Sequence, residues 1–119
     1  MTSPAPATPL QVIQQLGHLA SEMDRLTKAL REAEFAAAHA SADANVAEAR
    51  AFLYSTGPVE QRKATAKVEV ADKALASELA DVEVRCLRRE LDAVRTRIEV
   101  GRTYAATVRT ELTSLGNAA

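Results

Sequence analysis

Apolar residues recur along the first half of the chain at alternating spacings of four and three residues. This heptad spacing is typical of a helix that packs along one side against another helix. We call these positions the seam of the helix, and they run without a slip over Val12, Leu16, Leu19, Met23, Leu26, Leu30, Ala33, Ala37, Ala40, Ala44, Ala47, Ala51 and Tyr54. The pattern predicts one long helix over about residues 9–55.

The second half of the chain carries a seam with the same alternation. Its positions are Ala66, Val70, Lys73, Ser77, Ala80, Val84, Leu87, Leu91, Val94, Ile98, Gly101, Ala105, Val108, Leu112 and Leu115. Most of them are apolar, and the polar Lys73 and Ser77 are expected to weaken the packing locally. This seam predicts a second helix over about residues 58–115.

A Gly-Pro pair separates the two seams. Gly57 can end the first helix with a positive φ, Pro58 suits the first position of the second helix, and Glu60 favours its amino end. We therefore expect a tight reversal and an all-α fold, a long antiparallel helical hairpin with coiled-coil packing. A reversal centred on Gly57 places Leu16 opposite Ile98, Met23 opposite Leu91, and Leu30 opposite Val84.

Short segments flank the hairpin, which we expect to cover residues 9–116. Residues 1–8 are rich in proline and small residues, which predicts a flexible N-terminal arm. Thr8 can cap the first helix, with Pro9 at its first position and Gln11 completing a capping box. Gly116 and Asn117 are residues that end helices, and they leave residues 117–119 as a tail.

A second apolar stripe appears on each helix near the turn. Two helices cannot bury these stripes together with their seams, so we expect another helix to pack there and the hairpins to assemble into a multi-helix bundle. The predicted oligomer interface consists of Phe35, Phe52, Leu75, Leu79 and Val82. Cys86 lies on the same stripe, where a buried and inert thiol is expected.

Arginine recurs every seven residues beside the second seam, at Arg88, Arg95, Arg102 and Arg109. The positions expected beside this ladder on the first helix are Thr27, Ala20 and Ile13, none of them acidic. Asp92 and Glu99 lie on the same face, so one interpretation is a solvated ladder that pairs with itself. The other is that Arg102 and Arg109, which have no acid at the next turn, bind an acidic partner or phosphates.

Composition gives little support to charge-driven binding or to a thick core. The 15 basic and 16 acidic residues give a formal net charge of −1, which favours neither nucleic acid nor an anionic membrane. The chain has two Phe, two Tyr and no Trp, so sequence-tolerant stacking on single strands is disfavoured. One cysteine and the lack of an apolar span or signal peptide favour a reducing, cytoplasmic location without membrane binding.

The sequence contains no recognisable catalytic constellation, so we expect neither an enzyme nor a cofactor. His18 and His39 lack the carboxylate spacing of a metal site, and no metal ligands are predicted. The four glycines are isolated, which excludes a phosphate-binding loop. Gly101 falls on the seam, where we interpret it as a point of close helix approach.

Residues 40–112 resemble a diffuse group of small helical proteins of tailed bacteriophages. Members have an Ala-rich helix, a Gly-x-Val turn, a Gln-Arg or Glu-Arg pair, and a second helix with an arginine before an acidic residue. The matching residues are Gly57, Val59, Gln61, Arg62, Arg109 and Glu111. The resemblance implies a setting near phage recombination and replication genes, hence DNA metabolism in the host cytoplasm, and no defined activity.

These observations predict a non-enzymatic coiled-coil interaction module. The expected partners are further copies of the chain and another protein, from the host or the phage, with no small-molecule substrate. One alternative is a nucleic-acid-binding accessory of phage recombination or replication. Another is a structural coiled coil within an assembly.

Overall fold

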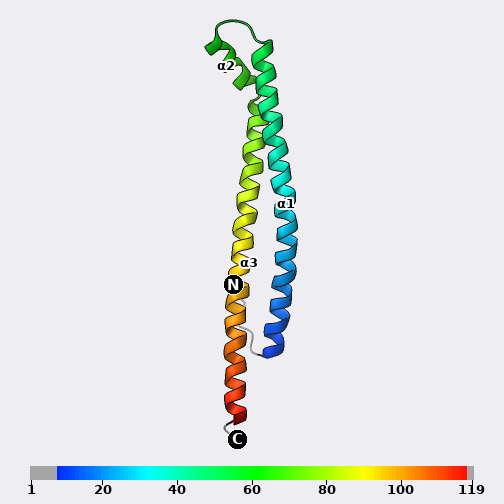
Figure 1. The fold of residues 1–119 in the computed structure, drawn as a ribbon, viewed down its shortest axis with the longest axis vertical. Helices are drawn as coiled ribbons and strands as arrows, with labels where there is room; N and C mark the ends of the chain where they lie inside the picture. Colours follow the sequence, from blue (N-terminus) through cyan, green and yellow to red (C-terminus); the bar gives the residue numbers. More distant parts are fainter. Residues whose placement is uncertain (1–7, 118–119) are drawn as a thin grey trace. The chain divides into compact units, whose positions relative to one another are not determined.

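The computed structural model describes residues 8–117, which form an all-α helical hairpin. Helix α1 spans Pro9–Tyr54, α2 spans Val59–Glu69 and α3 spans Ala71–Asn117 (Figure 1). Apart from Thr8, the expected N-terminal arm lies outside the described residues, as do residues 118–119 of the expected tail. Asn117 belongs to α3, so the helix continues past Gly116.

Both ends of α1 have local causes. The capping box at its start is confirmed, because the Thr8 amide donates to Gln11 Oε1 and the Gln11 amide donates to Thr8 Oγ1, each over 3.2 Å. After the helix, Gly57 adopts a φ of 107°, which only glycine tolerates well. Pro58 has an extended ψ of 155° and is the N-cap residue of α2. The helix therefore begins at Val59, one residue later than expected.

The expected second helix over residues 58–115 is interrupted at Val70. This residue has a φ of −102° and a ψ of 11°, outside the helical region, and it separates α2 from α3. In Figure 1, α2 departs from the line of α3 at this point. The β-branched Val68 and Val70 are weak helix formers. The bend coexists with burial of Val70 and Ala66, which are 8% and 1% exposed.

The chain divides into two compact units, each with its own helix pair. The first contains the start of α1 and residues 89–117 of α3, and the second, Lys28–Arg88, contains the rest of α1, the turn, α2 and the start of α3. Every buried apolar residue among the described ones lies on a predicted seam: Val12, Leu26, Ala37, Ala44, Ala66, Val70, Val84, Leu87, Leu91 and Val94. The hairpin and its two apolar seams are confirmed.

Four seam positions are exposed, contrary to expectation. Tyr54 is 86% exposed because it ends α1 at the turn. Lys73 is also exposed, as its charge favours. Leu112 lies level with Pro9 at the start of α1, so α3 beyond it has no described helix to pack against, and Leu112 and Leu115 are 54% and 70% exposed.

The alignment of the helices differs from the expected one beyond the turn. Arg62 contacts Phe52, as a reversal centred on Gly57 requires. In the first unit, however, Leu16 lies against Gly101, three residues past the expected Ile98. The interruption at Val70 lies on the chain between the turn and this changed register. The predicted alignment assumed one uninterrupted second helix, which the structure does not have.

Candidate binding surfaces

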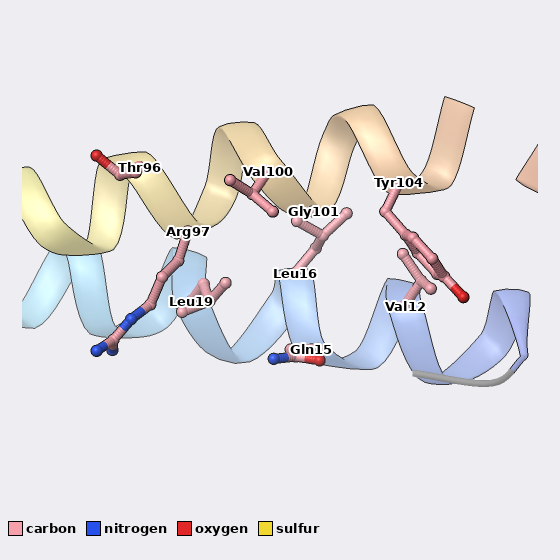
Figure 2. A pocket seen from close by; sticks show the side chains of 9 residues that line it. All are labelled: Val12, Gln15, Leu16, Leu19, Thr96, Arg97, Val100, Gly101 and Tyr104. Carbon is pink, nitrogen blue, oxygen red and sulfur yellow. The ribbon is translucent and has the colours of Figure 1, made fainter. Parts of the chain in front are cut away.

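In the first unit, an apolar groove of about 300 Å³ lies between α1 and α3 (Figure 2). Leu16 and Leu19 line it from α1, and Val100 and Gly101 line it from α3. The polar side chains that line the groove are those of Gln15, Thr96, Arg97 and Tyr104. Figure 2 shows Tyr104 at the Val12 end of the groove and Arg97 at the Leu19 end.

Gly101 shapes this groove by having no side chain. A Cβ atom built on Gly101 would lie 2.8 Å from Leu16 Cδ2, closer than such atoms approach in proteins. The close helix approach expected at this glycine is confirmed. A glycine on the seam was the signal for this approach, but the groove itself depends on the register with Leu16 and was not predicted.

In the second unit, α3 carries an exposed apolar stripe, which we call the outer α3 face. It consists of Ala71, Leu75, Leu79, Val82 and Cys86. Leu75, Leu79 and Val82 are 53%, 58% and 42% exposed. Cys86 is exposed and unpaired in the described chain, so the expectation of a buried thiol is wrong for this single copy. It is exposed because the outer α3 face as a whole points away from α1.

In the same unit, α1 carries a stripe of its own, which we call the outer α1 face. It consists of Phe35, Ala38, Ala42, Val46, Ala49 and Leu53. Phe35, Val46 and Leu53 are 58%, 50% and 70% exposed, and the alanines between them are exposed as well. The Arg31 guanidinium lies 5.7 Å from the centre of the Phe35 ring, within cation–π distance.

The two outer faces lie on opposite sides of the helix pair in this unit. Leu75 follows the buried Val70 by five residues, and Ala42 follows the buried Ala37 by five. In a helix of about 3.6 residues per turn, an offset of five points roughly away from the packed side. The predicted interface residues Phe35 and Leu75 therefore belong to two separate surfaces, which a single neighbouring helix cannot cover together.

Phe52 is set apart from both outer faces by Arg62 of α2. The Arg62 guanidinium lies 4.3 Å from the centre of the Phe52 ring. It also donates to the Phe52 carbonyl oxygen from Nε at 3.3 Å and from Nη2 at 3.0 Å. Ser55 Oγ donates to the same oxygen over 3.0 Å. Phe52 is thus half-buried within the turn, and Arg62 supplies a cap for the end of α1 that the sequence did not reveal.

The structure divides the arginine ladder into paired and unpaired members. Arg88 Nη2 lies 3.6 Å from Glu34 Oε2 of α1, so the expectation that the hairpin leaves the ladder unneutralised is wrong at this position. The acidic Glu34 thus lies beside Arg88, where the expected alignment placed Thr27. Arg95 pairs with Asp92 on its own helix over 3.5 Å. Among the described residues, Arg102 and Arg109 make no ion pair within 4.0 Å.

One further ion pair stabilises the start of α1 in the first unit. Arg25 donates from Nε to Glu22 Oε2 over 3.0 Å and from Nη2 to Glu22 Oε1. These hydrogen bonds lower the pKa of the Glu22 carboxyl below its ordinary value. Both side chains are substantially exposed. We therefore assign this pair to the helix surface.

Residues 8–117 show neither a metal site nor a membrane-spanning segment. No three potential metal-ligating side chains gather within this range. None of the described helices contains a stretch that is long and apolar enough to cross a membrane. No protein family, curated protein or solved structure matches the chain.

Proposed function

We propose that this chain is a non-enzymatic helical interaction module that associates through its outer α3 face, first of all with further copies of itself. The observation that carries the proposal is the exposure of Leu75, Leu79 and Val82 at helical spacing on one side of α3. Fully burying such a side chain is worth about 1.5–3 kcal/mol, so a second helix on this face is favoured. The phage setting implied by the resemblance, and with it a host or phage protein as a further partner, belongs to the same proposal.

The test introduces charge into this face. In Leu75→Glu with Leu79→Glu, association requires burial of two carboxylates, and we expect sedimentation velocity to show a smaller species than for the unmodified chain. The matched control is Thr103→Glu with Thr107→Glu. These exposed residues of α3 have the same spacing and the same position relative to the seam, but they lie outside the outer α3 face. Equal behaviour of the two double variants contradicts the proposal.

A second candidate function is binding to the phosphate backbone of nucleic acid. It is supported by Arg102 and Arg109, which lie seven residues apart on one side of α3 and have no ion-pair partner among the described residues. Two guanidinium groups at this spacing offer charge-assisted hydrogen bonds to phosphate oxygens. The formal net charge of −1 limits such binding to this local surface.

Salt dependence separates this candidate from the first. Arg102→Ala with Arg109→Ala should weaken binding to a labelled duplex and reduce the slope of log K against log salt by about 2. The control is Arg88→Ala with Arg95→Ala, which removes two arginines of the same spacing that already pair with Glu34 and Asp92. If the unmodified chain binds no duplex at low salt, or both double variants lose the same slope, the candidate fails.

A further inference from the structure

The outer α3 face and the outer α1 face require two neighbours. They lie on opposite sides of the helix pair, and both are exposed in the described chain. A symmetric dimer through the outer α3 face would cover Leu75 and Leu79 but leave Phe35 and Val46 in water. An arrangement that covers both faces needs each copy to present one face to each of two neighbours.

The two faces differ in shape in a way that fits one to the other. The outer α3 face projects Leu75, Leu79 and Val82, whereas the middle of the outer α1 face consists mainly of alanines. Small residues allow a neighbouring helix to approach closely, and bulky side chains fill the space between their turns. The stripes are also similar in length, about 22 Å for residues 71–86 and about 27 Å for residues 35–53 at the helical rise of ~1.5 Å per residue.

Charge disfavours contact between two outer α3 faces. From Ala71 to Cys86, α3 has two basic residues, Lys73 and Arg85, and four acidic ones, Asp72, Glu78, Asp81 and Glu83. Two copies of this segment in contact would bring like charges together. On α1, Lys28 and Arg31 lie with Glu32 at the Phe35 end of the outer α1 face, and Glu34 is paired with Arg88, which leaves a net positive charge at this end. Farther along α1, Asp43, Glu48 and Arg50 add a net negative charge, so the attraction is confined to the Phe35 end.

From these observations we propose that the outer α3 face of one copy docks on the outer α1 face of another. This inference rests on the self-association proposed above and specifies its geometry. The contact is heterologous, because different surfaces of the two copies meet. In the resulting complex one copy keeps its outer α1 face open and the other keeps its outer α3 face open. Association of this kind adds further copies beyond the dimer, and it ends only where the geometry closes a ring.

Two variants with one blocked face each test the geometry. Leu75→Glu with Leu79→Glu blocks the outer α3 face, and Phe35→Glu with Val46→Glu blocks the outer α1 face. Each variant alone retains only one functional face, so we expect both to sediment as monomers. Mixed in equal amounts, they should form a capped heterodimer of one copy each, because the intact outer α3 face of one fits the intact outer α1 face of the other.

A variant that removes no large apolar side chain guards against misfolding. Ala42→Glu places a charge in the middle of the outer α1 face at an exposed helical position. We expect it to block this face as Phe35→Glu with Val46→Glu does, without loss of the helical circular dichroism signal. If the variants blocked on α1 still self-associate, or if the mixture forms no heterodimer while the unmodified chain self-associates, the heterologous geometry is overturned. If the unmodified chain is itself a monomer, the self-association proposed above fails, and the docking fails with it.

Discussion

The guanidinium of Arg62 joins α2 to the end of α1 by two hydrogen bonds to the carbonyl oxygen of Phe52 and by contact with the Phe52 ring. The carbonyl is one of the last in α1, where helical partners run out. A charged donor that satisfies it from the neighbouring helix fixes the return of the chain as well as the end of α1. Arg62 therefore stabilises the turn between α1 and α2 through its contacts with Phe52.

Replacing Arg62 with alanine should therefore lower the free energy of unfolding. Hydrogen bonds from a charged group contribute about 1.5–3 kcal/mol, and we expect a loss in the lower part of that range because the side chain is only half-buried. Urea denaturation followed by circular dichroism measures the change. Lys63→Ala is the matched control, since Lys63 follows Arg62 in sequence and its ion pair is with the exposed Glu60. Equal losses in the two variants would contradict the role of Arg62.

Gly57→Ala should also destabilise the chain, by about 1–2 kcal/mol. The φ of 107° at this position is costly for a residue with a Cβ atom, and the added atom would meet Gln61 Oε1 at 3.0 Å. Thermal unfolding of Gly57→Ala and Gly17→Ala provides the comparison. Gly17 lies in the interior of α1 with open space around it, so alanine should stabilise that site. A stabilising Gly57→Ala would contradict the positive φ at the turn.

Much of the fold could be predicted because its seams are an uninterrupted physical pattern. The capping box at Thr8 and the positive φ at Gly57 are local as well, and they follow from the chemistry of neighbouring residues. The interruption at Val70 left no trace in the spacing, since Val70 is itself a seam residue and the alternation continues through it. The pairing of Leu16 with Gly101 could not be predicted either, because it depends on how two helices align and not on the spacing along one.

The candidate surfaces were predictable to a different degree. The exposed stripes consist of apolar residues that lie outside the seam positions, and for this reason Leu75 and Leu79 could be identified from the sequence. The predicted interface combined these residues with Phe35, although the same heptad positions place Phe35 on the opposite side of the helix pair. The cap by Arg62 and the ion pair of Arg88 with Glu34 depend on which residues meet across the pair, and the spacing along one helix does not contain that information.

The packing of Leu16 against Gly101 leads to a prediction about the groove in the first unit. In Gly101→Ala the new methyl group must displace Leu16 Cδ2, the end of a flexible side chain that has the groove of about 300 Å³ beside it. Alanine gains up to about 1 kcal/mol in helix propensity, so the variant should be stabilised, but by less than Gly17→Ala. Chemical denaturation of both variants tests this. A loss greater than about 1 kcal/mol in Gly101→Ala would mean that Leu16 has no room to move.

The most direct test of self-association is the mass of the unmodified protein in solution as a function of concentration. A single chain has a mass of 12.7 kDa. Sedimentation equilibrium from low to high micromolar concentration should give a weight-average mass that rises above this value. If the two outer faces dock on one another, the mass should continue to rise past that of a dimer. A mass that stays at 12.7 kDa over the whole range would contradict the account.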